Sequence, residues 1–269
     1  MRLLTPIVPD ARAPLARANP VAKLGAALVL LLGLFASLDG VTATIVLTVL
    51  LVVLAAWSGI PPASLVGRAW LIGLAAISIG VFNVLFAPQQ TGPMVVDVGP
   101  IRIGADTLLD GLGLSVRLLA IALAGILATA TSQPTEVADA LVQQLRVSPR
   151  FAIGVLASLR LLPLFAHEWQ TIGMARRARG VEAGRSPIAA ARLFAGQMMA
   201  LLVGAIRRGT RMATAMEARG FGARECRSVA RVQRMRSGDW GWIGGSILLV
   251  AGAIGVSLAL GTWAPLIGG

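Results

Sequence analysis

Long apolar runs without charged side chains set the limits on what this chain can fold into. Val41–Trp57, for example, has no charged residue over a length that can cross a lipid bilayer. Only 13% of the 269 residues are charged, whereas soluble globular proteins average about 25%. A transmembrane β-barrel needs segments of about ten residues with alternating polarity, and these runs do not alternate. The sequence therefore predicts an all-α polytopic membrane protein.

About five transmembrane helices are expected from these runs. Asp39-Gly40 predicts a tight turn after the first run, and Pro61-Pro62 predicts a break before the third. Strand-forming residues on both sides of Gly99-Pro100 predict a short hairpin before the fourth run. The five predicted spans are Ala22–Leu38, Val41–Trp57, Ala69–Ala87, Thr107–Ala130 and Trp240–Leu260.

Basic residues are concentrated between the fourth and fifth spans. Residues 131–239 hold 17 of the 24 lysines and arginines but only 7 of the 12 acids. Because cytoplasmic segments of membrane proteins are enriched in Lys and Arg, we expect this segment in the cytoplasm of a plasma-membrane protein. The expected organisation is a cytoplasmic N-terminal tail (1–19), transmembrane helices (20–130), a cytoplasmic helical domain (131–239) and a C-terminal transmembrane helix (240–269). How far helices within 150–213 enter the membrane stays open.

Three helical stretches are expected within the basic segment. The first begins at Ser132-Gln-Pro134, and the second runs from Pro149 to Arg179 with a kink at Pro163. The third starts at Ser186-Pro187, an N-cap followed by proline at the first helical position. It ends at Arg219-Gly220, about 34 residues and about 50 Å later.

Two Ala-Arg-Gly triplets end the second and third of these helices. Glycine just past a helix suits the left-handed C′ position, and arginine in the last turn interacts favourably with the helix dipole. Helix termination and cytoplasmic charge explain one such triplet. Two triplets at matching places predict a pair of docking tips, because arginine pairs with carboxylates at interfaces. The candidate residues are Ala178, Arg179, Gly180, Ala218, Arg219 and Gly220.

The chain resembles the transmembrane (T) component of energy-coupling factor (ECF) transporters. The resemblance lies in Leu159-Arg-Leu-Leu-Pro-Leu164 and Glu168 before the first triplet, and in Ser186-Pro187 and Ala215–Phe221 around the second. It covers roughly residues 19–260. It implies a membrane scaffold whose long cytoplasmic coupling helices carry the triplets, with Arg179 and Arg219 as docking arginines.

The same resemblance implies partners and a function. Two ABC-type ATPases would bind the triplets, and ATP hydrolysis would drive a membrane-embedded substrate-binding (S) component to release a vitamin or transition metal. The S component would choose the substrate, so this chain does not specify it. Met198, Met199, Met212 and Met216 suggest an adaptable surface for that S component, with ordinary core filling as the alternative.

Other functions find less support. The only lysine, Lys23, is not part of a nucleotide-binding loop, so ATP chemistry must belong to a partner, and we expect no catalytic residues or cofactor. One Cys and one His predict no metal site, and arginines without interleaved aromatics predict no nucleic-acid partner. A polytopic enzyme acting on lipid is the alternative, although Asp106 and Asp110 are the only paired acids near a span. Arg117 lies within the fourth span, where a charge is costly, and is therefore a functional candidate; the alternative is that it pairs with Asp110 or lies near an aqueous face. Glu168 is expected to be solvated or interfacial.

Overall fold

The structure is a computed structural model that describes residues 13–59, 62–87, 91–98, 101–182, 184, 186–221 and 232–264. Most of the predicted N-terminal tail lies outside these residues. The chain divides into two compact units, which we describe separately. Unit 1 comprises Met1–Ala140 and Gln233–Gly269, and unit 2 comprises Leu141–Val232.

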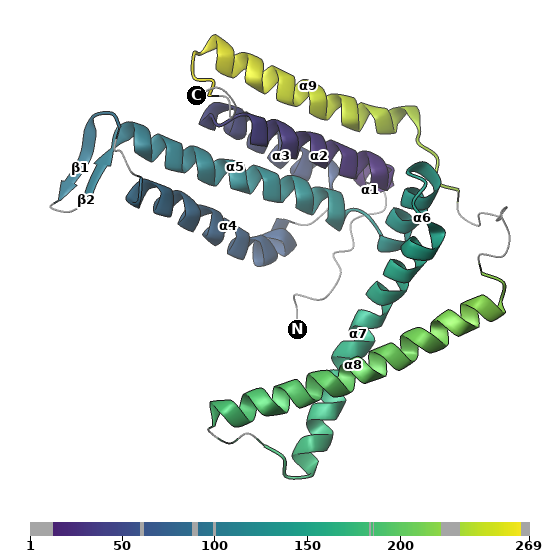
Figure 1. The fold of residues 1–269 in the computed structure, drawn as a ribbon. Coiled ribbons are helices and arrows are strands. Elements are labelled where there is room, and N and C mark those ends of the chain that lie inside the picture. The colour runs from purple at the N-terminus through teal and green to yellow at the C-terminus, as the bar shows by residue number, and fades with distance from the viewer. Residues whose placement is uncertain are drawn as a thin grey trace. The chain divides into compact units, whose positions relative to one another are not determined.

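The described residues form helices and one small hairpin (Figure 1). The two strands pair antiparallel, with Val98 opposite Ile101, which confirms the predicted hairpin. In chain order the elements are α1 (Pro14–Arg17), α2 (Pro20–Ala36), α3 (Gly40–Trp57), α4 (Pro62–Leu85), β1 (Met94–Val98), β2 (Ile101–Gly104), α5 (Ala105–Ala130), α6 (Pro134–Gln144), α7 (Pro149–Ala178), α8 (Pro187–Ala218) and α9 (Ser237–Ala259).

Among the described residues, five helices are long and apolar enough to cross a membrane: α3, α5, α7, α8 and α9. The expectation of an all-helical, multi-pass membrane protein is confirmed. The set differs from the predicted spans, because α2 and residues 70–85 of α4 are shorter apolar helices, whereas α7 and α8 qualify by length and composition. The start of α4 also differs from the prediction, at Pro62 instead of Ala69.

The helices of unit 1 alternate in direction. Gly25 and Gly33 of α2 face Ile243 and Val250 of α9, so α2 and α9 run parallel. Trp57, at the end of α3, meets Trp242 near the start of α9, so α3 runs in the opposite direction.

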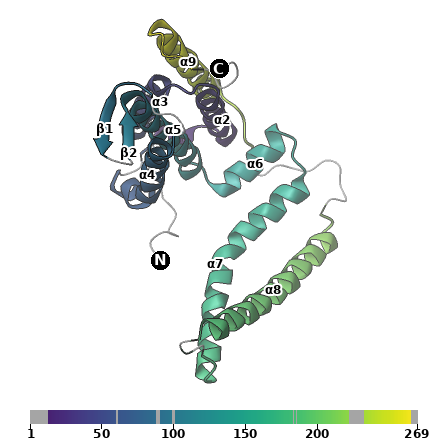
Figure 2. The ribbon, with the colours of Figure 1, turned by 60° about the vertical axis from the view of Figure 1, so that its left-hand side comes forward.

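Helix α5 packs against α2, α3 and α4 (Figure 2). Gly113, near its start, touches Gly40 at the start of α3, and Thr131, just past its end, receives a hydrogen bond from Lys23 at the start of α2. Helix α5 therefore runs parallel to α3 and antiparallel to α2, as expected of a chain that crosses a membrane repeatedly.

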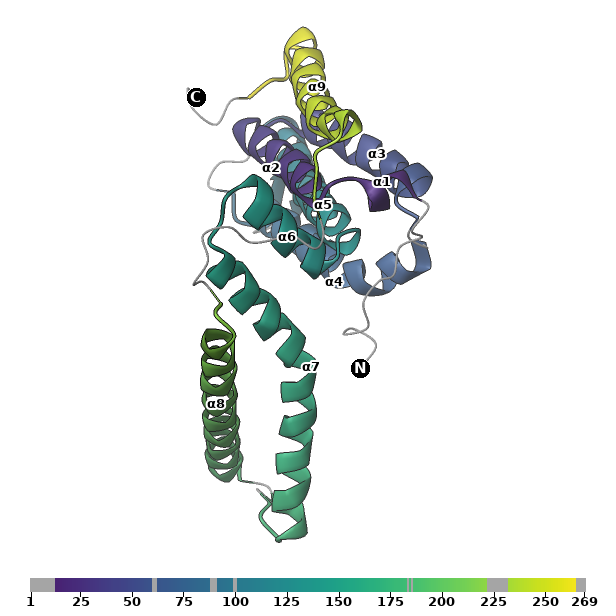
Figure 3. The ribbon, with the colours of Figure 1, turned by 90° about the vertical axis from the view of Figure 1, so that its right-hand side faces the viewer.

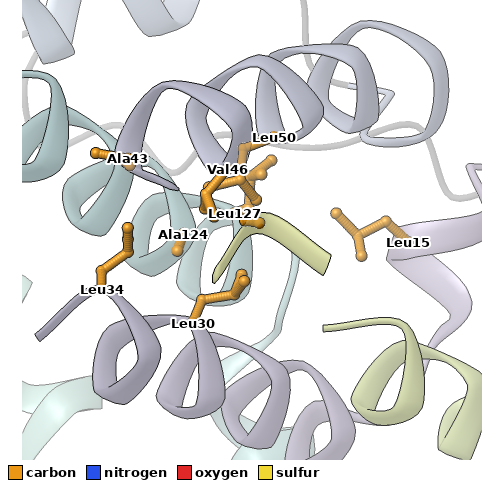
Figure 4. Close-up of a cluster of buried hydrophobic side chains, with 10 residues drawn as sticks. Leu15, Leu30, Leu34, Ala43, Val46, Leu50, Ala124 and Leu127 are labelled. Atoms are coloured by element: carbon orange, nitrogen blue, oxygen red, sulfur yellow. The ribbon is translucent and has the colours of Figure 1, made fainter. Parts of the chain in front are cut away.

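Apolar side chains from α2, α3 and α5 meet in the core of unit 1 (Figure 4). Leu30 and Leu34 of α2, Val46 and Leu50 of α3 and Leu127 of α5 are all buried. Other large apolar side chains of the unit 1 helices are exposed, as expected where lipid replaces water. Examples are Leu28, Phe35, Val52, Phe82 and Leu248.

Buried polar contacts close both ends of this core. At one end the Lys23 ammonium donates to the Thr131 carbonyl at 2.8 Å, and the Asn19 amide donates to Asp239 Oδ1 at 2.8 Å. At the other end Asp39 caps α3 and accepts hydrogen bonds from the Ser37 hydroxyl and, at 2.7 Å, the Thr42 amide. Burial raises the pKa of Asp39, but hydrogen bonds from Ser37 and Thr42 outweigh it and hold the pKa below its ordinary value.

Unit 2 is built on α7 and α8. Its side chains are much less buried: α7 buries only Ala152, and α8 buries no residue. Figure 3 shows α7 changing direction about midway along its 30 residues, the part of the helix that contains Pro163. A proline inside a helix removes one hydrogen bond and pushes away the preceding turn, which accounts for the bend.

Candidate docking site for partner proteins

The first Ala-Arg-Gly triplet ends α7 in a Schellman motif. The Gly180 amide donates to the Arg177 carbonyl at 2.9 Å, and the Val181 amide donates to the Arg176 carbonyl at 3.0 Å. Gly180 has φ +71°, the left-handed conformation that favours glycine. The predicted role of this glycine is confirmed.

The second triplet ends α8 in the same motif. The Gly220 amide donates to the Glu217 carbonyl at 2.9 Å, and the Phe221 amide donates to the Met216 carbonyl at 3.0 Å. Gly220 also has φ +71°. The two helix ends are therefore matched hydrogen bond by hydrogen bond, with an apolar residue directly after each glycine.

Both triplet arginines are exposed and end their helices in the same conformation. Arg179 and Arg219 have nearly the same backbone angles, φ −91° and ψ 8° against φ −85° and ψ 9°. All six triplet residues are exposed. Within the described residues, neither guanidinium takes part in an ion pair or a side-chain hydrogen bond. Each guanidinium thus retains its donors for a partner.

The triplets lie at opposite ends of an antiparallel helix pair. Arg176 of α7 donates to the carbonyl of Leu193 in α8 at 2.7 Å, whereas Glu168, earlier in α7, pairs with Arg208, later in α8. The 32 residues of α8 span about 48 Å, which separates its C-terminal triplet from the connection that follows the first triplet. The sequence predicted two matching tips but not their direction, since a helical pattern does not reveal which way a neighbouring helix runs.

The contacts that hold α7 and α8 together were not expected from the sequence. Arg208 donates twice to Glu168 Oε2 at 3.2 Å and lies 5.5 Å from the Phe165 ring centroid. Trp169 meets Phe194 edge to face at 5.3 Å between ring centroids. Glu168, expected to be solvated or interfacial, is 30% exposed and paired with Arg208. The sequence did not indicate this partner, because it lies 40 positions along the chain.

The four methionines of α8 do not lie in a buried core. Met198 and Met199 are 45% and 62% exposed, and Met212 and Met216 are half-buried. Phe194, about one turn before Met198 on α8, contacts Trp169 of α7. This part of the α8 surface is therefore partly covered by α7. Their role as a contact for an S component stays a prediction.

Arg117 is buried in α5. Its Nε and Nη2 atoms have no hydrogen-bond partner among the described residues. Among the described residues Arg117 forms no ion pair, and Asp110 is exposed. Neither suggested environment, a pairing with Asp110 or an aqueous face, is found.

Comparison with known proteins places this arrangement in a family. Residues 11–228 match the model of the CbiQ family, described as "Cobalt transport protein". The energy-coupling factor transporter transmembrane protein EcfT of Leuconostoc gelidum subsp. gasicomitatum is 32% identical over 175 residues, 61% of this chain and 60% of that relative. EcfT 1 of Listeria monocytogenes is 30% identical over 193 residues, 69% of this chain and 70% of that relative. The chain thus spans about two thirds of the length of the relatives it matches.

The family match covers both triplets and all elements from α1 to α8. Together with the apolar helices of unit 1, it identifies the chain as a multi-pass membrane protein that belongs to the CbiQ family and is similar to the EcfT transmembrane components of ECF transporters.

Proposed function

We propose that this chain is the T component of an ECF transporter in the plasma membrane. It couples ATP hydrolysis by two ABC-type ATPase subunits to substrate release by an S component in vitamin or transition-metal uptake. The observation that carries the proposal is the pair of matched, exposed arginine tips at opposite ends of one antiparallel helix pair. Two separated tips allow two partner subunits to bind at the same time.

The chemistry of each tip suits a protein partner with an acidic groove. Arginine forms paired hydrogen bonds with a carboxylate through its planar guanidinium. Nothing lies within 4 Å of a Cβ built on Gly180 or Gly220, so the backbone beside each arginine is open to close approach. The nucleotide chemistry belongs to the partners, and this chain supplies the mechanical connection.

The charge distribution supports placing unit 2 at the cytoplasmic surface. Helix α3 has no charged residue, whereas α7 and α8 carry charges near their middles, including Arg160 and Arg207. Charged side chains inside a bilayer are costly unless they are paired or face water. Length and composition alone would allow α7 and α8 to span the membrane, but these charges favour a position at its surface. We also place the N-terminus in the cytoplasm.

The open apolar face of α8 is the proposed contact for the S component. Met198 and Met199 lie beside exposed Leu202, Val203 and Ile206. Exposed apolar patches of this kind mark interaction surfaces, and flexible methionine side chains adapt to different partners. We include Met212 and Met216 in the same surface.

No observation on the described residues favours the alternative function, an enzyme acting on lipid. Asp106 and Asp110, the paired acids near a span, are both exposed.

Charge reversal at the tips tests the docking. We expect Arg179→Glu and Arg219→Glu each to weaken binding of one ATPase subunit, and the double variant to lose both. The measurement is the ratio of ATPase subunits to this chain after co-expression and purification. Arg177→Glu and Arg211→Glu are matched controls, because both arginines are exposed on the same helices outside the triplets.

Two results would contradict the proposal. One is a double variant that inserts in the membrane, retains both ATPases and supports normal uptake. The other is equal loss of ATPases in the control variants, which would show that binding depends on overall charge and not on the tips.

A further inference from the structure

An apolar cavity lies within unit 1, between α2, α3, α5 and α9. Its volume is about 250 Å³. Its walls include Ala27 and Leu30 of α2, Val53 of α3, Leu127 of α5 and Leu249 of α9. Leu15 of the short helix α1 also lines it. Of the side chains labelled in Figure 4, those that line the cavity are Leu15, Leu30, Leu50, Ala124 and Leu127.

Helix α9 forms one wall of the cavity, and two of its lining residues there are glycines. Gly241 and Gly245 line the cavity without side chains, and a Cβ built on either would meet nothing within 4 Å. Trp57 and Trp242 also line it, and their rings meet edge to face at 5.8 Å between centroids. Tryptophans are enriched at the level of lipid headgroups, so this end of the cavity lies near the membrane surface.

The charges around the cavity are positive on balance. Lys23 lines the cavity, and its ammonium donates to the Thr131 carbonyl at 2.8 Å. Arg234 and Arg236 are exposed in the segment that leads into α9. Arg17, two residues after Leu15, is also exposed. Three exposed arginines therefore lie within a few residues along the chain of cavity-lining residues: Arg17 is close to Leu15, and Arg234 and Arg236 precede Gly241.

We propose that this cavity binds one acyl chain of an anionic phospholipid, whose headgroup contacts Arg234 and Arg236. The apolar walls suit a hydrocarbon chain and offer few partners to a polar metabolite. Clustered basic residues at the end of membrane helices attract anionic headgroups. This site is separate from the docking tips, and its test does not depend on the proposed transport function.

A larger side chain in place of a cavity-lining glycine of α9 tests the acyl-chain part of the proposal. The full chain is purified into nanodiscs of equimolar phosphatidylglycerol and phosphatidylcholine, and lipids that remain bound after delipidation are identified by native mass spectrometry. We expect the wild-type protein to retain phosphatidylglycerol and Gly245→Leu to retain at least five-fold less. Gly252→Leu is the matched control, since Gly252 lies two turns further along α9, is equally open and does not line the cavity.

A second variant tests the headgroup part of the proposal. We expect Arg234→Gln with Arg236→Gln to remove the preference for phosphatidylglycerol over phosphatidylcholine while a bound phospholipid is still found. The circular dichroism spectrum of each variant verifies that its helices are intact. Equal retention in wild type and Gly245→Leu, equal loss in Gly252→Leu, retention of a free fatty acid instead of phospholipid, or an unchanged headgroup preference in the arginine variant would overturn the proposal.

Discussion

The two units of this protein are stabilised in different ways. In unit 1, glycines bring helix backbones close together, as where Gly40 meets Gly113 and Gly80 meets Gly111. In unit 2, two helices of 30 and 32 residues meet through a few side chains and bury almost nothing. The first unit has a shape fixed by its own packing, whereas most side chains of the second stay exposed. This difference is expected if unit 1 serves as an anchor and unit 2 binds partners.

The largest expected effect is in the packing of unit 1. A Cβ on Gly80 would lie 1.9 Å from Ser115 Oγ and 2.5 Å from the Gly111 carbonyl oxygen, so α4 and α5 must separate. We expect Gly80→Ala to destabilise the protein by about 3 kcal/mol, measured as a lower Tm in detergent. Gly73→Ala, on the same helix with nothing within 4 Å, is the control and should not lower the Tm. Equal Tm values for both variants would contradict the close packing.

The charge of Asp39 provides a pH-dependent test of the same unit. Because its pKa is lowered in the folded protein, Asp39 adds stability above its unfolded pKa, and this stability is lost as the pH falls through the folded pKa. Asp39→Asn keeps an N-cap residue for α3 but removes the charge that accepts the hydrogen bonds from Ser37 and Thr42. We expect the variant to be about 1–3 kcal/mol less stable at neutral pH. The gap between the two Tm curves should narrow below about pH 4, and a gap independent of pH would contradict this role.

A smaller effect is expected at the tips of unit 2. Gly220→Ala forces a side chain into a φ of +71° and should cost about 1 kcal/mol, confined to the last turn of α8. Gly209→Ala makes the same chemical change inside α8, where nothing lies within 4 Å, and should stabilise the helix. Hydrogen exchange over residues 213–221 should therefore speed up in the first variant and slow down in the second. Equal exchange in both would refute the role of the glycine.

The smallest effect is expected where α7 meets α8. The Glu168 and Arg208 side chains are 30% and 35% exposed, and solvent weakens their attraction. We expect Glu168→Gln to cost about 0.5 kcal/mol and to leave unit 1 unchanged. A double-mutant cycle with Arg208→Gln should return a coupling energy of similar size for the pair. A coupling energy of zero would contradict the observed contact.

Local features were readily predicted from the sequence. The Ser186 side chain accepts the Ala189 amide as a helix cap, Pro187 occupies the first helical position, and both triplet glycines take the left-handed conformation. Each of these features depends on a few consecutive residues. Helix ends, turns and the hairpin are determined at that range, and so they are visible in a single sequence.

Long-range features of the site were not predicted. The Glu168–Arg208 pair and the Lys23–Thr131 hydrogen bond join positions 40 and 108 residues apart. They depend on which helices are neighbours and in which direction they run. A hydrophobic pattern identifies the apolar face of a helix but not the helix that covers it.

The crossing of α7 and α8 divides the two helices into arms of unequal length. The contacts centre near Trp169 and Gln197 to Gly204, so the tip at Arg179 is about 15 Å from the crossing and the tip at Arg219 is about 30 Å from it. A scissor-like rotation of about 10° at the crossing would move the first tip by about 3 Å and the second by about 5 Å. Two subunits bound at these tips would experience different displacements and leverage from one motion, so mechanical asymmetry is built into a pair of nearly identical helix ends.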